Sequence, residues 1–165
     1  MRPPNLPLDA VTALPLVYRA TIPEAYRDVM DHMNVRWYLA LFDDAGIDLF
    51  ENIGITEAYF KANQTGTMDL EHHIHYLAEV RIGDAVSIYA RILGFTPKRL
   101  HYMLFMVNET RSRLAATLEV MNTHVDMTTR RTAPYADPIA EAISAMLADH
   151  QRLDWAAPVC GVMRP

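Results

Sequence analysis

The sequence predicts an α+β domain in which an antiparallel sheet wraps around one long helix. Two patterns lead to this prediction. Residues 35–50 are apolar on most of a helix circumference, so such a helix must be buried on most of its sides. Long β-rich segments separated by short turns follow between residues 68 and 125, which is typical of an antiparallel meander. A sheet curled around the helix satisfies both patterns.

Length, charge and cysteine content limit the classes of protein that fit. A chain of 165 residues suits one domain, and its net charge of −5 provides no basic footprint for nucleic acid. No apolar run reaches the roughly 18 residues of a membrane span. The N-terminus is rich in proline rather than in the apolar residues of a signal peptide. Cys160 is the only cysteine, so no intramolecular disulfide can form. We therefore expect a cytoplasmic protein that binds neither nucleic acid nor membranes.

The N-terminal third contains the predicted central helix. Residues 1–13 are expected to form an irregular arm, and residues 14–22 a first strand that ends at Pro23. One stripe of the helix predicted over residues 34–51 consists of Tyr38, Leu41, Phe42, Ala45 and Leu49. Gly54 is a candidate cap for the end of this helix, and residues 56–63 are expected to form a second, short helix.

The rest of the chain completes the predicted sheet and adds a terminal helix. The expected strands cover residues 68–80, 85–95, 100–107 and 113–125. Asp137 is a good N-cap, and Pro138 suits the first position of a helix that ends near Leu153. The predicted organisation is an arm (1–13), a main domain (14–135), and a C-terminal helix and tail (136–165). The second face and the edges of such a sheet usually need a partner chain.

Asp28 stands a few residues ahead of the central helix. A helix N-terminus carries unpaired N–H groups and partial positive charge. A carboxylate beside it can act as a general base or a nucleophile while those amides stabilise an oxyanion. The other interpretation is an ordinary turn in which Asn34 caps the helix. The residues alone leave both interpretations open.

The residues around Asp28 resemble the signature of a known family. Asp28-x-x-Asp31-His32-Met33-Asn34-x-x-x-Tyr38 is similar to the D-x-x-G-H-[MV]-N-x-x-x-Y pattern of hotdog-fold acyl-CoA thioesterases of the 4-hydroxybenzoyl-CoA thioesterase type. Residues 71–84 resemble the second-strand block of these enzymes. Residues 94–101 and 123–134 look like a narrower branch, the thioesterases of carnitine catabolism, whose proposed substrate is betainyl-CoA.

The resemblance implies a fold, a reaction and an assembly. It covers about residues 14–135 and implies a hotdog fold that hydrolyses a small acyl-CoA thioester. Coenzyme A is then part of the substrate, and no metal or other cofactor is expected. The active sites of the family lie between subunits, so we expect a homodimer or a homotetramer. A metal site formed by His72, His73 and His75 remains an alternative for that cluster.

The same resemblance assigns roles to individual residues. The expected catalytic residues are Asp28, His32, Met33 and Asn34. Asp28 would activate water or attack the thioester carbonyl, and Asn34 would orient the turn. Asp31 departs from the pattern, because the family has glycine there. Glycine adopts positive φ readily, whereas Asp does so less easily and adds a second negative charge near Asp28.

Three further groups of residues are candidates for binding the substrate. Each group also has an ordinary structural explanation, as hydrogen-bonded histidines, core aromatics or a solvated charged face. Trp37, Tyr38 and Tyr76 are candidates for binding the acyl group, since aromatic rings suit the trimethylammonium group that the resemblance implies. Glu71 and His73 are candidates for substrate binding because they could line the active site from the neighbouring strand. The candidates for the phosphates of coenzyme A are Lys98, Arg99, Arg130 and Arg131.

An acyl-CoA thioesterase is therefore the function that we predict. One alternative is a non-catalytic protein that binds acyl-CoA or another small molecule on the same fold, which the Asp31 departure favours. Another is a subunit whose main role is assembly with a dehydrogenase.

Overall fold

The computed structural model describes residues 6–165. The first five residues of the predicted arm lie outside the described residues. The rest of the arm is not irregular, because a short helix, α1 (Leu8–Thr12), follows Pro7. Val11 of this helix is fully buried. A single buried side chain produces no periodic pattern, so no local pattern indicated this turn of helix.

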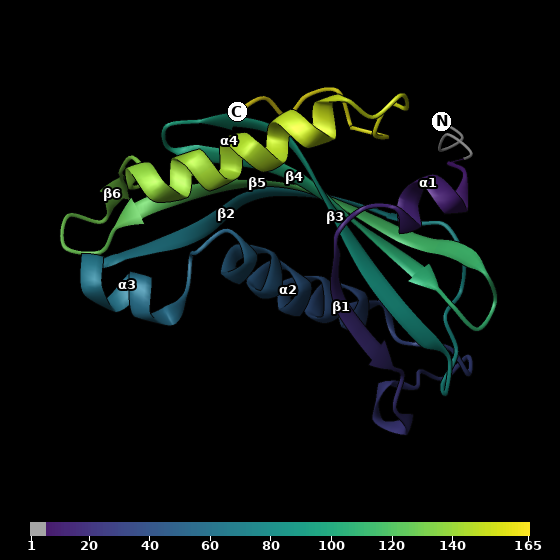
Figure 1. Ribbon diagram of the computed structural model, residues 1–165. Helices are drawn as coiled ribbons and strands as arrows, with labels where there is room; N and C mark the ends of the chain where they lie inside the picture. Colours follow the sequence, from purple (N-terminus) through teal and green to yellow (C-terminus); the bar gives the residue numbers. More distant parts are fainter. Residues whose placement is uncertain (1–5) are drawn as a thin grey trace. The chain divides into compact units, whose positions relative to one another are not determined.

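The remaining elements agree with the predicted α+β class (Figure 1). In chain order they are β1 (Leu16–Thr21), η1 (Glu24–Tyr26), α2 (Val35–Asn52), α3 (Glu57–Asn63), β2 (Thr65–Tyr76), β3 (Ala85–Thr96), β4 (Arg99–Asn108), β5 (Arg113–Asp126), β6 (Arg131–Thr132) and α4 (Asp137–Gln151). The strand order in the sheet is β1-β3-β4-β5-β2, and β6 pairs with β5. Strand β2 therefore lies at one edge.

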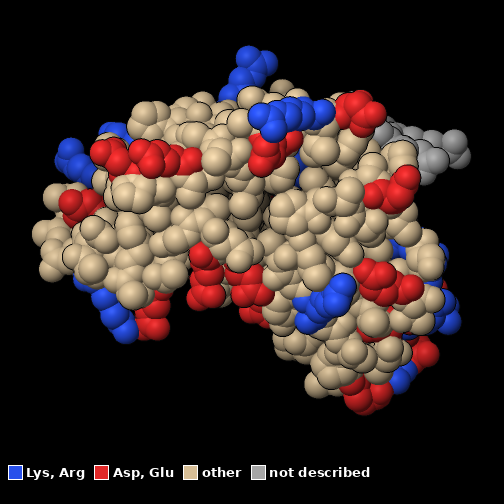
Figure 2. Space-filling model, viewed as in Figure 1, with Lys and Arg blue, Asp and Glu red and all other residues tan. Residues whose placement is uncertain are grey.

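The chain forms two compact units, and several elements pass from one to the other. Among the described residues, unit 1 comprises 6–48, Ile74–Ala90 and Leu104–Leu118. Unit 2 comprises Leu49–His73, Arg91–Met103 and Glu119–Pro165. No helix in the described part of the chain is long and apolar enough to cross a membrane. On the face shown in Figure 2, acidic and basic side chains are interspersed.

In unit 1, β1 pairs antiparallel with β3, with Thr21 opposite Ala85. The turn before β3 is held by Asp84, whose Oδ2 accepts hydrogen bonds from Asn108 Nδ2 at 2.7 Å and from Arg111 Nε at 2.8 Å. Burial acts to raise the pKa of Asp84, but these hydrogen bonds outweigh it and the pKa lies below its ordinary value. Further along β3, the hydroxyl of Tyr89 donates to Glu109 at 3.4 Å.

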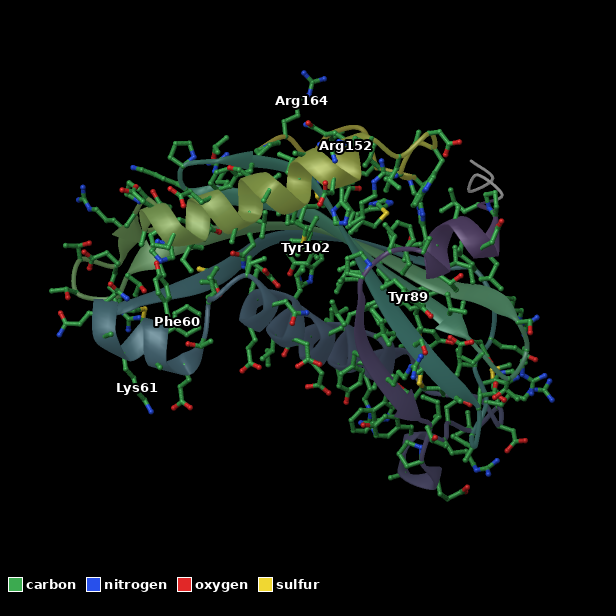
Figure 3. The ribbon with its side chains drawn as sticks, in the orientation of Figure 1. Phe60, Lys61, Tyr89, Tyr102, Arg152 and Arg164 are labelled. Carbon is green, nitrogen blue, oxygen red and sulfur yellow. The ribbon has the colours of Figure 1, made fainter. Side chains whose placement is uncertain are left out.

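In unit 2, the end of α2 is capped as the sequence predicted. Gly54 has φ of 88°, the Gly54 amide donates to Glu51 at 3.0 Å, and the Ile55 amide donates to Phe50 at 2.8 Å. This double closure is the Schellman motif, which glycine favours. Phe50 then packs edge-on against Tyr102 of β4, with ring centroids 5.9 Å apart. Tyr102 is labelled in Figure 3.

Helix α4 lies over the strands of unit 2 (Figure 1). It begins one residue earlier than predicted. Ala136 is the N-cap and makes no side-chain hydrogen bond, and Asp137 and Pro138 are the first two helical residues. At its other end, His150 Nδ1 accepts a hydrogen bond from the Ile92 amide at 2.9 Å. The pKa of His150 is lowered, chiefly by burial.

The segment that follows α4 covers polar residues of unit 2. Glu119 is buried, and its two oxygens lie 2.8 Å from His101 Nε2 and 2.6 Å from the Cys160 amide. The Arg91 guanidinium stacks on Trp155 at 4.2 Å and donates to the Trp155 carbonyl at 2.9 Å. These contacts explain why polar residues on the strands of this unit are buried.

Strand β2 differs most from its prediction, since it covers Thr65–Tyr76 instead of 68–80. Leu77 and Ala78 both donate their amides to the Ala115 carbonyl, at 2.8 and 3.0 Å. Two consecutive donors on one acceptor interrupt a regular ladder, so the strand ends before Leu77.

Candidate active site

The Asp28 side chain closes the turn ahead of α2. Its Oδ1 accepts hydrogen bonds from the amides of Met30 at 2.8 Å and His32 at 3.0 Å. The Asp28 amide in turn donates to the His32 carbonyl at 2.8 Å. Hydrogen bonds from the His32 and Met30 amides hold the pKa of Asp28 below its ordinary value, so its carboxylate is ionised near neutral pH.

Most of the amides where α2 begins already have acceptors within the protein. The Met33 amide donates to Val80 at 2.8 Å, the Asn34 amide donates to Tyr26 at 2.9 Å, and the Arg36 amide donates to Asn34 Oδ1 at 3.2 Å. Asn34 therefore acts as an N-cap in this structure. Val35 is the first residue of the helix, and its amide makes no hydrogen bond to any residue that the structure describes.

An open groove of about 410 Å³ adjoins this turn in unit 1. It joins the start of α2 to the end of β2 and the segment that follows. Its lining residues are Asp28, His32, Met33, Val35, Tyr38, Tyr76, Leu77, Ala78 and Glu79. The groove thus contains three of the four predicted catalytic residues and two of the predicted substrate-binding aromatics.

Tyr38 and Tyr76 form one wall of the groove. Their rings meet edge to face, with centroids 5.2 Å apart and an interplanar angle of 86°. The buried Tyr38 hydroxyl accepts a hydrogen bond from the Val80 amide at 3.1 Å. Burial raises the pKa of both tyrosines. Tyr76 is half exposed, so its ring offers an apolar face to a ligand.

Trp37 is placed differently from the other aromatic candidates. Its ring stacks on Tyr26, with centroids 3.8 Å apart, and it does not line the groove. Arg36 lies over the same ring at 5.0 Å. Trp37 Nε1 is buried and has no hydrogen-bond partner among the described residues. In unit 1, Trp37 therefore packs against the segment that precedes α2.

Glu79 also lines the groove, although no sequence motif singles it out. Its Oε2 lies 2.7 Å from His32 Nε2, and its Oε1 lies 2.7 Å from Arg81 Nη2. The Arg113 guanidinium donates to the Glu79 backbone carbonyl at 3.2 Å. The sequence signal was present, since Glu79 belongs to the block 71–84, but nothing local shows that it faces His32.

The other predicted binding residues belong to unit 2. Glu71 is exposed and His73 is half-buried, both on β2. His72, between them, pairs with Asp69 at 2.8 Å. No group of three or more potential metal ligands occurs among residues 6–165.

The four predicted phosphate contacts lie on neighbouring segments of unit 2. All four side chains, those of Lys98, Arg99, Arg130 and Arg131, are exposed. The His124 amide donates to the Lys98 carbonyl at 3.0 Å, and the Tyr135 amide donates to the Pro97 carbonyl at 2.9 Å. The first bond joins the turn between β3 and β4 to strand β5, and the second joins it to the segment that follows β6, so the four cations lie on neighbouring segments.

Comparison with known proteins identifies the family. The model of the thioesterase-like superfamily matches residues 25–143. The chain belongs to this superfamily. A betainyl-CoA thioesterase from Pseudomonas aeruginosa is 26% identical over 82% of this chain and 86% of the relative. An L-carnitine dehydrogenase/betainyl-CoA thioesterase from Rhizobium meliloti is 29% identical over 92% of this chain, which spans only 30% of that relative's length.

Two solved structures share the fold of this chain. A putative thioesterase from Pseudomonas putida has a TM-score of 0.75 and 27% identity, covering 92% of this chain and 96% of that one. A hypothetical protein from Staphylococcus aureus, solved in complex with CoA, has a TM-score of 0.83 and 23% identity over the same shares. The predicted hotdog fold is thus confirmed.

Asp31 stands where the family pattern has glycine, yet it keeps the glycine-like backbone. Its φ is 67°, in the left-handed region that glycine adopts most easily. The Asp31 carboxylate pairs with Arg27, and the Asp31 amide donates to the Asp28 carbonyl at 3.3 Å. The turn that presents Asp28 therefore closes without glycine.

Proposed function

We propose that the protein hydrolyses the thioester of a small acyl-CoA in the groove beside Asp28. The observation that supports this most is an ionised carboxylate held by two amides at the start of a helix, in a chain of the thioesterase-like superfamily. In this proposal Asp28 serves as a general base for water or as the nucleophile, and the free Val35 amide stabilises the oxyanion. Water is the only co-reactant, and no cofactor is needed.

Replacement of Asp28 tests the proposal. Asp28→Asn keeps the size of the side chain and removes its basicity, so we expect kcat for thiol release to fall by about 10²- to 10⁴-fold. Asp43→Asn is a matched control, because Asp43 is exposed on α2 outside the groove. Normal turnover in Asp28→Asn would show that the mechanism is wrong. The remaining residues of the turn, Met33 and Asn34, hold its geometry in this proposal.

Betainyl-CoA is the substrate that we propose first. Relatives of the chain carry this name, and the exposed face of Tyr76 against Tyr38 suits a trimethylammonium group. Trp37, Glu71 and His73 are proposed as further substrate-binding residues. A panel that measures kcat/KM for betainyl-CoA and for simple fatty acyl-CoAs tests this choice. Equal values across the panel would exclude a site built for the cation.

Lys98, Arg99, Arg130 and Arg131 are proposed to bind the phosphates of coenzyme A. Their support is their exposure and their position on neighbouring segments. Replacing Lys98 and Arg99 together by glutamine should raise KM for acyl-CoA and leave kcat nearly unchanged, because uniform binding is lost. Turnover of a short acyl-pantetheine substrate, which lacks the nucleotide phosphates, is the control and should not change.

We also propose that the active unit is a homodimer or homotetramer. Val35, Leu39 and Ile47 of α2 are 55%, 44% and 53% exposed, and the edge strand β2 exposes Met68 and Leu70. Unpaired strand edges and apolar helix faces are commonly covered by a second copy. Light scattering during gel filtration measures the mass in solution, and a monomer at micromolar concentration would exclude this assembly. The cytoplasmic location stays a prediction.

A binding protein without catalysis is the second candidate. The feature that favours it is Asp31, which adds a negative charge beside Asp28. Mass spectrometry of the purified protein after incubation with acyl-CoA separates the two functions. A binding protein retains intact acyl-CoA, whereas an enzyme releases free coenzyme A.

A further inference from the structure

We propose that Glu79 is a positioning residue, which holds the His32 imidazole as the proton-transfer group of the candidate active site. The proposal rests on the thioesterase function proposed above. It starts from one contact, the 2.7 Å between His32 Nε2 and Glu79 Oε2. Both side chains line the groove that Asp28 also lines.

The surroundings of Glu79 decide what this contact does to the imidazole. Glu79 Oε1 accepts from Arg81 Nη2 at 2.7 Å and from Arg81 Nε at 3.0 Å. Arg113 fixes the backbone of Glu79 through its carbonyl at 3.2 Å. A carboxylate bound to arginine stays ionised and can only accept hydrogen bonds. Oε2 is thus left to face His32.

The contact selects one tautomer of His32. A ring nitrogen 2.7 Å from an ionised oxygen must carry the proton, since two lone pairs at that distance repel each other. With its proton on Nε2, a neutral imidazole presents Nδ1 as an acceptor. No residue within the described range 6–165 hydrogen-bonds to His32 Nδ1. Nδ1 is therefore available to a water molecule in the groove.

Asp28 and His32 then have different roles in the reaction. The two amides that bind the Asp28 carboxylate keep it ionised, so it takes up a proton poorly near neutral pH. Imidazole is the side chain that exchanges protons most readily in that range. Asp28 is suited to making the bond to carbon, and His32 is suited to moving the proton.

Hydrolysis then takes place in two steps with Asp28 as the nucleophile. Asp28 attacks the carbonyl carbon, the C–S bond breaks, and coenzyme A leaves as a thiolate. Water then attacks the acyl carbon of the anhydride while His32 Nδ1 takes one of its protons, and the bond to Asp28 breaks to restore the carboxylate. The imidazolium, stabilised by Glu79, gives its proton to the thiolate. The products are the free acid and the thiol.

The tautomer can be measured without any turnover. Nitrogen-15 spectra of the full chain labelled at histidine should show the Nε2-protonated form for His32, with the signal assigned by its loss in His32→Gln. Glu79→Gln should convert this signal to a mixture of tautomers. A spectrum that is identical in wild type and Glu79→Gln would overturn the positioning role.

Thiol release then tests the chemistry. We expect kcat to fall about 100-fold in His32→Gln and about tenfold in Glu79→Gln, with KM within about threefold of wild type. Glu79→Asp should recover part of the loss, and added imidazole should restore turnover in His32→Ala but not in Asp28→Asn. Glu141→Gln, on the exposed face of α4, is the matched control.

The double variant, which combines His32→Gln with Glu79→Gln, shows whether the two residues act as one unit. Its kcat should be no lower than that of the single variant His32→Gln, because Glu79 acts through His32. If the two losses in kcat multiply, or if Glu79→Gln keeps the wild-type kcat, the positioning role of Glu79 is wrong while the proposed function stands. A wild-type protein that hydrolyses no thioester would overturn the proposed function itself.

Discussion

Replacement of Asp31 tests the idea that the turn needs a left-handed residue and not a particular side chain. Asp31 has φ of 67°, so an L-residue without local hydrogen bonds costs about 1 kcal/mol or more at this position. Glycine removes that cost. It also adds about 0.4–1 kcal/mol of conformational freedom to the unfolded chain, and the two effects nearly cancel.

The ion pair of Asp31 with Arg27 adds little to this balance. The Asp31 side chain is 73% exposed, so solvent screens the pair and its contribution to stability is small. In the Asp31 variants Arg27 still pairs with Glu24, whose two carboxylate oxygens lie 2.5 and 2.7 Å from the guanidinium. We therefore expect Asp31→Gly to unfold within about 0.5 kcal/mol of wild type, and Asp31→Ala to be less stable by about 1 kcal/mol.

Urea unfolding followed by tryptophan fluorescence and circular dichroism measures these differences. With a slope near 2 kcal/mol/M, a loss of about 1 kcal/mol lowers the midpoint by about 0.5 M. Equal midpoints for Asp31→Ala and Asp31→Gly would refute the reasoning, because the cost of positive φ to alanine would then be no larger than the freedom that glycine adds to the unfolded chain. Asp43→Ala, in the regular helix α2, provides the control for an exposed Asp-to-Ala change.

Two further predictions concern buried hydrogen bonds. Tyr38→Phe leaves the buried Val80 amide without its acceptor and should cost about 1–3 kcal/mol in urea unfolding, whereas Tyr76→Phe, at a half-exposed ring, should cost under about 0.5 kcal/mol. His150 has a pKa lowered by burial, so the unfolded chain binds its proton first as the pH falls. Stability from this group is complete above about pH 6.5 and is lost as the pH falls towards the folded pKa. His150→Asn, which offers the Ile92 amide an oxygen and does not titrate, should lose less stability between pH 7.5 and 5.5.

The tyrosine variants and the His150 variant can each contradict their prediction. Equal losses in Tyr38→Phe and Tyr76→Phe would mean that the Val80 amide finds another acceptor. An identical pH dependence in His150→Asn would assign the acid instability to other groups, of which the buried His124, whose pKa is also lowered by burial, is the first to test.

The sequence predicted those parts of the structure that local patterns determine. Helix α2 was recognisable because its apolar residues recur at helical spacing, and its end because Gly54 can adopt positive φ. The hairpins were recognisable from their turn residues. Strand β2 was misplaced by three to four residues, because its end depends on the Ala115 carbonyl of another strand. No local pattern encodes such a pairing.

The candidate site was predictable to a similar extent. Asp28 and Tyr38 lie in one short motif, so the sequence alone predicted that both belong to one site. Glu79 reaches His32 from a distant part of the chain, and only the fold shows that the two meet. Trp37 has the right residue type and the right neighbours in sequence, but its position on the helix turns it towards Tyr26 and away from the groove.

Asp31, which replaces the glycine of the family pattern, lies in the turn that presents Asp28 to the groove. A glycine in the family pattern could be required for its backbone conformation or for the space that a missing side chain leaves. Here the conformation is kept, and the side chain pairs with Arg27 while Asp28 still receives both of its amides. The backbone conformation is thus sufficient to present Asp28. What Asp31 changes is charge, so its effect should appear in turnover, as a higher kcat in Asp31→Asn at low salt that fades as salt screens the carboxylate.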